Sequence, residues 1–170
     1  SSDVCSSDLA AGYRYVSLDI TNADEINTVF EQYQPNVVIH TAAMTNVDTC
    51  ETDQAGCQVL NVTAVSYLIA ACQKHDTFLC HLSTDFIFDG EEGPYTEDAI
   101  PNPISIYGES KLRAEKLIEG SSIRWAIART VLVFGIVADM SRTNIILWVK
   151  KSLEEGKQIN VVTDQFRTPT

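Results

Sequence analysis

Short apolar runs alternate along this chain with longer segments whose apolar residues recur at helical spacing. The runs that read as strands share apolar, β-branched or aromatic residues and occupy residues 13–19, 37–40, 78–82, 125–134 and 159–163. The helical patterns lie between them, at residues 22–33, 59–72, 105–119 and 145–153. Alternating strands and helices build βαβ units, which place helices on both faces of a parallel sheet. The pattern therefore predicts an α/β fold with a doubly wound parallel sheet.

Composition limits the kinds of partner that we expect. The chain has 170 residues, of which 45% are hydrophobic and 21% are charged, as is ordinary for a globular domain with a core. Its net charge of -11 argues against nucleic-acid partners and anionic membranes, because both attract basic surfaces. No apolar stretch approaches the roughly 20 residues of a membrane span, and no basic-then-apolar leader opens the chain. We expect a cytoplasmic protein.

The cysteines and histidines do not predict a metal site. The five cysteines show no C-x-x-C spacing and no spacing with histidine that is typical of metal ligands. Free thiols are the expectation, with Cys72 and Cys80 as fillers of the core. His40 and His81 are interpreted as core or strand-end histidines that have hydrogen-bond partners.

Both ends of the chain depart from the pattern. Residues 1–9 have no periodicity, and we interpret them as a non-native leader. The chain stops at Pro169-Thr170, directly after a predicted strand and without a helix to close the unit. These features suggest a fragment, with residues 10–170 forming an incomplete domain.

Tyr107 and Lys111 lie four residues apart at the head of a predicted helix, on the face that also carries its apolar residues. Lys111 is therefore expected to point inward, whereas the opposite face holds Glu109, Arg113, Glu115 and Lys116. A cation beside a phenol favours the phenolate and lowers its pKa. Carbonyl reduction needs a proton donor that works near neutral pH, and such a pair would provide one. A pattern of this length also arises by chance.

Three predicted strands end in small or polar residues. The first ends on Asp19, and the other two are followed by residues 41–45 and by residues 83–85. In open parallel sheets, ligands bind beyond the carboxyl ends of the strands. Small side chains such as Ala42 and Ala43 would let a flat cofactor approach the backbone. We expect the three strand ends to line one crevice.

Three segments stand out together: Leu-Ser-Thr-Asp-Phe-Ile-Phe-Asp-Gly at 82–90, Tyr-Gly-Glu-Ser-Lys-Leu at 107–112 and Asp-Gln-Phe-Arg-Thr-Pro-Thr at 164–170. In this order they resemble the extended short-chain dehydrogenase/reductases, and among these the dTDP-4-dehydrorhamnose reductases. The resemblance covers about residues 13–170. It implies a Rossmann-like, NAD(P)-binding fold that continues into the start of a substrate-binding part.

The resemblance also implies roles for individual residues. Thr84, Tyr107 and Lys111 would be catalytic, with Tyr107 protonating the nascent alkoxide. Tyr107 and Lys111 would also contact the cofactor, which would be NADP or NAD. The other residues expected to contact it are Asp19, Ile20, Ala42, Ala43, Met44, Thr45 and Ser83. Thr84, Asp85 and Arg167 would contact the substrate.

Several of these residues have a structural alternative. Asp19 could simply cap the following turn, Met44 could pack a loop, and Asp85 could be structural. Arg167 suits a phosphate group but equally suits a solvated loop.

The sequence departs from the family pattern in three places. Phe86 stands where related dehydratases carry a glutamate, so dehydration is not expected. Val131-Leu132 follows Arg129-Thr130, where the family typically has Ser-Trp, so the indole expected to support the sugar is missing. No G-x-x-G-x-x-G turn follows a strand, and such a turn would hold the cofactor pyrophosphate. We expect this chain to bind a dinucleotide weakly or not at all.

The resemblance favours NAD(P)H-dependent reduction of the 4-keto group of a nucleotide-linked 6-deoxysugar. A non-catalytic relative such as the regulatory subunit of methionine adenosyltransferase is an alternative, because it shares the Ser-Thr-Asp and Y-x-x-x-K patterns. A nucleotide-sugar epimerase or another ketoreductase is a further alternative. The sequence leaves open the choice between NAD and NADP and the oligomeric state, with a homodimer as one alternative.

Overall fold

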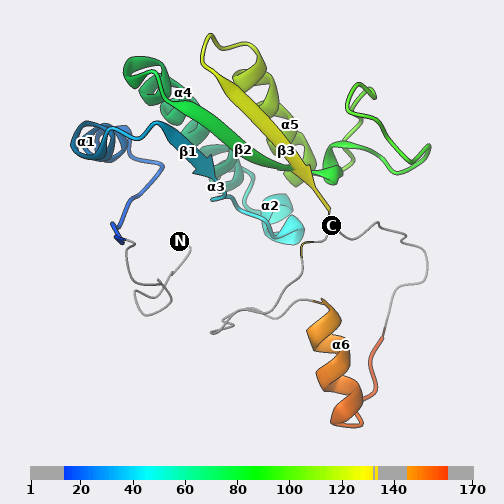
Figure 1. The fold of residues 1–170 in the computed structure, drawn as a ribbon. Helices are drawn as coiled ribbons and strands as arrows, with labels where there is room; N and C mark the ends of the chain where they lie inside the picture. Colours follow the sequence, from blue (N-terminus) through cyan, green and yellow to red (C-terminus); the bar gives the residue numbers. More distant parts are fainter. Residues whose placement is uncertain (1–13, 132, 134–144, 161–170) are drawn as a thin grey trace. The chain divides into compact units, whose positions relative to one another are not determined.

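The computed structural model describes residues 14–131, 133 and 145–160, which fall into two compact units. The first unit spans Val16–Arg129, and the second contains the described residues from Thr130 onward together with Arg14 and Tyr15. The elements up to the unit boundary (Figure 1) are α1 (Ala23–Tyr33), β1 (Val37–His40), α2 (Val47–Thr52), α3 (Gln54–Gln58), the π-helical turn η2 (Val59–Thr63), α4 (Ala64–His75), β2 (Phe78–Thr84), the 3-10 turn η3 (Asp85–Ile87), α5 (Ile106–Glu119) and β3 (Trp125–Thr130).

The sheet has the strand order β1-β2-β3, and its three arrows run in the same direction in Figure 1. In the parallel pair β1 and β2, Val37 lies opposite Phe78 and His40 lies opposite His81. This register brings the carboxyl ends of the two strands together. The predicted α/β class with a parallel sheet is confirmed.

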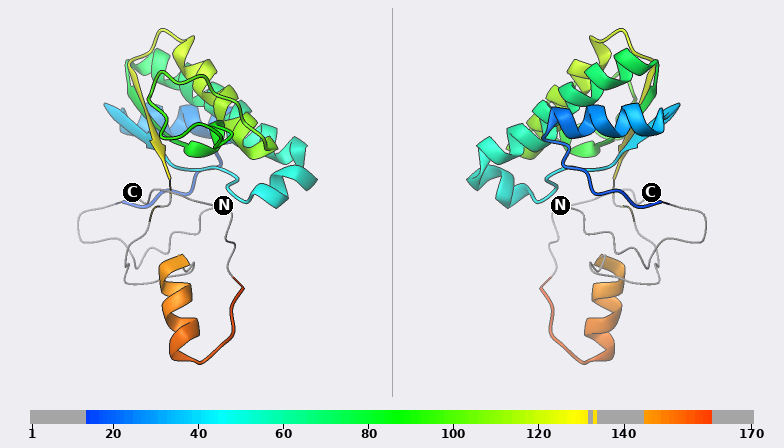
Figure 2. Two further views of the ribbon diagram at one scale, coloured as in Figure 1. Left: turned by 90° about the vertical axis from the view of Figure 1, so that its right-hand side faces the viewer. Right: turned by 90° about the vertical axis from the view of Figure 1, so that its left-hand side faces the viewer.

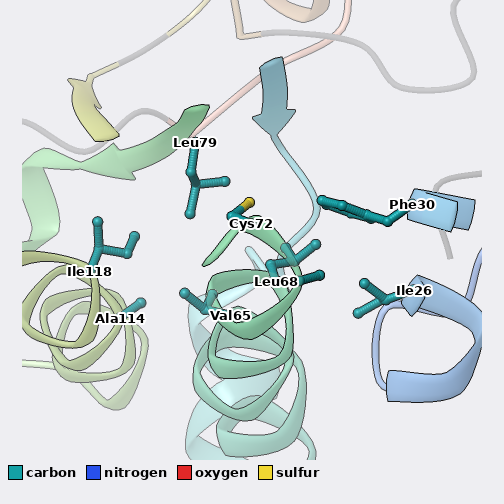
Figure 3. Packing of buried hydrophobic residues seen from close by; sticks show 9 residues of the cluster. Ile26, Phe30, Val65, Leu68, Cys72, Leu79, Ala114 and Ile118 are labelled. Atoms are coloured by element: carbon teal, nitrogen blue, oxygen red, sulfur yellow. The ribbon is translucent and has the colours of Figure 1, made fainter. Parts of the chain in front are cut away.

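Helices α1, α4 and α5 lie on the same face of this sheet (Figure 2). The core that they form with β2 contains Ile26, Phe30, Val65, Leu68, Ala71, Cys72, Leu79, Ala114 and Ile118 (Figure 3). On the other face, Val37 and Ile39 remain 55% and 66% exposed. We expected helices on both faces and a fully buried strand at 37–40; among the described residues of this unit, only one face is covered by helices.

The first predicted strand, at 13–19, is wrong over the described residues 14–19, which are in no strand. A strand exists only with a partner for its backbone groups, and the sheet of the described residues offers this segment none. The strand predicted at 125–134 ends at Thr130 and is largely exposed rather than buried. The strand predicted at 159–163 falls mostly outside the described residues, and Ile159 and Asn160 are in no strand.

Helix α1 begins and ends where the sequence indicates. The Asn22 side chain accepts hydrogen bonds from the backbone N–H groups of Asp24 and Glu25, which satisfies two donors of the first turn. Gln34 takes a left-handed conformation with φ 45° just before Pro35, and the helix stops there.

The helical stretch Gln54–His75 is long and apolar enough to cross a membrane by length and composition alone. This corrects the expectation that no stretch approaches that length. In the structure, its residues Val65, Leu68 and Cys72 are buried in the core described above. A core helix of this kind meets the same criterion, so the finding does not indicate a membrane span.

Glu115 departs from the expected polar face of α5, because it is only 1% exposed. Arg129, on β3, places Nη2 2.8 Å from Glu115 Oε2 and Nε 3.1 Å from Oε1. The buried carboxylate is tolerated because the guanidinium pairs with it. This pair joins α5 to β3, and spacing along the helix alone gives no sign of it.

The second unit contains the helix α6 (Ile145–Glu154), which the sequence predicted at 145–153. Its lysines lie near glutamates one turn on, as in the pair Lys150–Glu154.

Candidate active site

The carboxyl end of β2 carries Ser83 and Thr84, both buried, and continues into η3. The Thr84 hydroxyl accepts a hydrogen bond from the Phe86 N–H at 3.2 Å and donates one to Asp85 Oδ1 at 3.2 Å. Thr84 therefore caps the turn, and this role fixes the position of its hydroxyl group.

Tyr107 lies in the first turn of α5. Ser105 caps this helix by accepting a hydrogen bond from the Gly108 N–H at 3.1 Å. The Tyr107 ring is 8% exposed and meets Phe86 edge-on, with ring centroids 5.5 Å apart. The Thr84 side chain lies close enough to the Tyr107 phenol to lower its pKa, as the second influence on that pKa after burial. The structure thus brings together two of the three residues expected to be catalytic.

Gly108 allows α5 to begin directly beside η3. A Cβ atom at this position would overlap the Phe86 carbonyl group and lie 3.1 Å from Pro103 Cβ. Glycine is therefore needed for the close approach that sets the Tyr107 ring against Phe86.

Lys111 follows one turn later and points inward, as the sequence predicted, with 3% of its surface exposed. Its Nζ donates to the Leu82 carbonyl oxygen at 2.6 Å and lies 3.1 Å from His81 Nε2. Burial lowers the pKa of Lys111 to about 8, and Glu115 acts in the opposite direction.

The expectation that Lys111 lowers the pKa of Tyr107 is wrong for this structure. Burial raises the pKa of the Tyr107 phenol above its ordinary value, and the Thr84 side chain only partly offsets that increase. The physical reason is that burial of the phenol is the largest influence on its pKa, while the Lys111 ammonium donates its hydrogen bonds at Leu82 and His81. The resting phenol therefore keeps its proton.

Asn61, in η2, is a polar residue of the site that the sequence analysis missed. It is 1% exposed, and its side chain accepts from the Met44 N–H at 2.7 Å and donates to the Met44 carbonyl at 3.0 Å. It also donates to Ser110 Oγ at 2.9 Å, which ties the loop after β1 to α5. A single asparagine within a nearly continuous apolar helix was the available signal.

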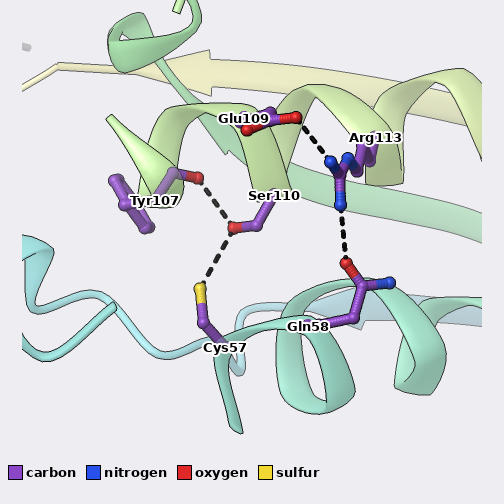
Figure 4. Close-up of polar contacts among 6 residues, drawn as sticks. All are labelled: Cys57, Gln58, Tyr107, Glu109, Ser110 and Arg113. Atoms are coloured by element: carbon purple, nitrogen blue, oxygen red, sulfur yellow. Dashed lines mark hydrogen bonds and ion pairs between the residues drawn. The ribbon is translucent and has the colours of Figure 1, made fainter. Parts of the chain in front are cut away.

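Figure 4 shows the neighbouring contacts on α5. Ser110 Oγ bonds the Tyr107 carbonyl at 2.7 Å and lies 3.5 Å from Cys57 Sγ, while Arg113 bridges Glu109 and Gln58 on the surface. Cys57 and Cys50 are buried with Tyr107 in one apolar cluster. Burial raises the pKa of the Cys50 thiol to about 12, so it remains protonated.

The residues expected beside the cofactor lie in three places. Asp19 is exposed and accepts hydrogen bonds from the Thr21 N–H at 2.9 Å and the Thr21 hydroxyl at 2.7 Å, which lower its pKa. This is the capping arrangement that the sequence left as an alternative. Ile20 packs against the core.

Residues 41–46 form the loop after β1 that the sequence predicted as small and open. Ala42 and Ala43 are half-buried there, Thr45 is exposed, and the Met44 side chain packs against the cluster of Tyr107. Arg167 lies outside the described residues.

Comparison with known proteins places the chain in a family. Residues 4–170 match the model of the RmlD substrate binding domain. The chain belongs to this family. It is 34% identical over 157 residues to dTDP-4-dehydrorhamnose reductase of Aggregatibacter actinomycetemcomitans, covering 92% of this chain and 52% of that protein. It is 30% identical over 167 residues to methionine adenosyltransferase 2 subunit beta of Xenopus tropicalis, covering 95% of this chain and 50% of that protein.

The same family resemblance holds for solved structures. The crystal structure of dTDP-4-dehydrorhamnose reductase from Bacillus anthracis in complex with NADP superposes with a TM-score of 0.83 at 32% identity. The match covers 90% of this chain and 54% of that one. This RmlD-family chain therefore has the Rossmann-like fold of the NADP-binding reductases, and it spans about half the length of the relatives it matches.

Proposed function

We propose that the protein reduces the 4-keto group of a nucleotide-linked 6-deoxysugar with NADPH or NADH, as a cytoplasmic enzyme. The observation that carries this proposal is that the buried Thr84 side chain lies beside the buried Tyr107 phenol at the end of β2 and acts on its pKa, with Lys111 buried one turn further along α5. The similarity to dTDP-4-dehydrorhamnose reductases supports the choice of substrate.

Each of the three side chains has a definite task in this reaction. Tyr107 keeps its proton at neutral pH and donates it to the oxygen of the reduced carbonyl. The Thr84 hydroxyl, which donates to Asp85 in the resting site, would turn to donate to the phenolate that remains, because a hydrogen bond to the charged form favours that form. Lys111 supplies a positive charge behind them. Asp85 and Arg167 remain candidates for contacts with the sugar and its diphosphate.

The chain offers surroundings that suit a nicotinamide cofactor. The half-buried Ala42 and Ala43 leave the backbone at the end of β1 approachable, and Met44 is held by Asn61 beside the Tyr107 cluster. Thr45, Ser83 and Lys111 would add polar contacts, and Asp19 and Ile20 would lie towards the adenine. When bound, the reduced nicotinamide supplies the hydride. The NADP complex of the Bacillus anthracis relative makes NADPH the first cofactor to test.

A steady-state assay of the full-length protein tests the proposal. We expect NADPH oxidation that depends on dTDP-4-dehydrorhamnose and falls by about 10²- to 10⁴-fold in Tyr107→Phe, because that variant removes the proton donor. Binding of NADPH should be retained. A wild-type rate no greater than that of Tyr107→Phe would contradict the proposal.

A second candidate is a non-catalytic subunit, favoured by the 30% identity to methionine adenosyltransferase 2 subunit beta over 95% of this chain. This alternative predicts that the full-length protein binds a methionine adenosyltransferase and does not turn over keto sugars. The assay described above distinguishes the two candidates directly.

A further inference from the structure

A buried chain of three titratable side chains runs from α5 across the sheet. Lys111 Nζ lies 3.1 Å from His81 Nε2, and His81 Nδ1 lies 3.2 Å from His40 Nδ1. The two imidazole rings stack, with centroids 5.1 Å apart and planes 17° apart. His81 is on β2 and His40 lies opposite it on β1. All three side chains are at most 5% exposed.

The hydrogen bonds among Lys111, His81 and His40 fit one arrangement of protons when the lysine is charged. An ammonium group has three N–H donors and no acceptor, so His81 Nε2 must accept from Lys111. His81 then carries its proton on Nδ1 and donates it to His40 Nδ1. The proton of His40 is left on Nε2, which has no hydrogen-bond partner among the described residues.

The burial of Lys111, His81 and His40 and the charges around them support this arrangement. Burial, followed by the positive charge of Lys111, lowers the pKa of His40 to about 4 and that of His81 to about 2. Lys111 itself keeps a pKa of about 8, helped by Glu115 on the same helix, which Arg129 of β3 holds in place. Near neutral pH the lysine is therefore the charged member and both histidines are neutral.

We propose that His81, supported by His40, is a positioning residue for Lys111. Together with the Leu82 carbonyl it occupies two of the three N–H groups of the ammonium, so that one N–H is left for a bound ligand. The role of this pair in turnover rests on the reductase function proposed above. The hydrogen-bond arrangement itself does not.

The arrangement of protons can be measured without substrate. Long-range ¹H–¹⁵N correlation spectra of the full-length protein report which ring nitrogen of each histidine carries a proton. We expect the Nδ1–H form for His81 and the Nε2–H form for His40, both neutral down to about pH 5. His81 in the Nε2–H form, or either ring charged at neutral pH, would overturn the proposal.

The role in turnover is tested with two variants at one position. His81→Leu removes the acceptor, whereas His81→Gln keeps an oxygen that accepts from Lys111. Losing an acceptor disfavours the buried ammonium, so Lys111 loses its proton at lower pH. For His81→Leu we expect a lower kcat and an almost unchanged KM for the sugar. The pH at which kcat/KM falls on the alkaline side should be lower by about one unit than in the wild type.

In His81→Gln the alkaline fall in kcat/KM should occur at the same pH as in the wild type. His75→Gln, at the end of α4, is the control substitution of a histidine outside this cluster. A purely structural role would lower the amount of folded enzyme without changing the pH at which kcat/KM falls. An unchanged pH of this fall in His81→Leu would therefore refute the positioning role. If the full-length protein reduces no keto sugar, the proposed function fails. The spectra still decide which ring nitrogens of His81 and His40 carry protons.

Discussion

At the scale of single residues, Thr84 has two tasks that usually belong to different positions. Its hydroxyl caps η3 by accepting from the Phe86 N–H, and its side chain opposes the rise that burial causes in the pKa of the Tyr107 phenol. The cap holds the hydroxyl where the phenol needs it. The backbone turn after β2 therefore sets the geometry of the proposed proton donor.

Replacing Thr84 by valine should reduce turnover with little change in size or fold. The phenolate formed during proton transfer would lose a hydrogen bond, so we expect kcat to fall by about 10- to 100-fold. Thr84→Ser keeps the hydroxyl and should retain most of the activity. Steady-state rates of the full-length variants check this, and equal rates for the valine and serine variants would contradict the role of the hydroxyl.

Single residues also set the limit of what the sequence predicts about the site. Thr84, Tyr107 and Lys111 are found because they lie in short motifs with fixed spacing along the chain. Asn61 is missed, and His81 is interpreted only as a core or strand-end histidine, because their partners, Met44 and Lys111, come from other elements and meet them only after folding. For the same reason the sequence assigned Lys111 to the phenol, whereas the ammonium is bound to His81.

At the scale of elements, α5 combines a site at its first turns with two ion pairs of different burial. Arg113–Glu109 lies on the surface, with both side chains about half exposed at 54% and 46%. Arg129–Glu115 joins α5 to β3, and its carboxylate is 1% exposed. Ion pairs of similar geometry are therefore expected to contribute very differently to stability, because water screens only the first.

Two matched substitutions on α5 test this difference. Glu115→Gln leaves the Arg129 guanidinium without its charge partner in a partly buried position, and we expect it to lower the free energy of unfolding by about 2–3 kcal/mol. Glu109→Gln should lower it by less than about 1 kcal/mol. Urea unfolding of the two variants measures both values. Equal losses would contradict the proposed contribution of the buried pair.

The elements themselves were predicted to different degrees. Helices α1, α4, α5 and α6 follow from their apolar spacing and caps, because those signals are local. The segment at 14–19 has strand-like residues but is in no strand, because a strand depends on a neighbour that local spacing does not reveal. β1 is exposed on one face and β3 is largely exposed for a related reason: burial depends on which helices cover the sheet.

At the scale of the whole molecule, the residues of the candidate site lie at the end of the sheet where the strands have their carboxyl ends. The parallel register of β1 and β2 places the loop after β1 at the same end of the sheet as Thr84, and α5 packs against β2. By contrast, a small pocket lined by Cys72, Asp76 and Arg124 lies at the other end of β2, away from Tyr107. Chemistry is therefore expected at the carboxyl ends of the strands, as in other open parallel sheets.

The most direct measurement follows the hydride in the full-length protein. NADPH that carries deuterium at the transferred position is incubated with dTDP-4-dehydrorhamnose, and the sugar product is analysed by mass spectrometry and NMR. We predict deuterium at C4 of the sugar, with the label almost absent when Tyr107→Phe replaces the wild type. A sugar without deuterium at C4, or equal labelling by the Tyr107→Phe variant, would contradict the account.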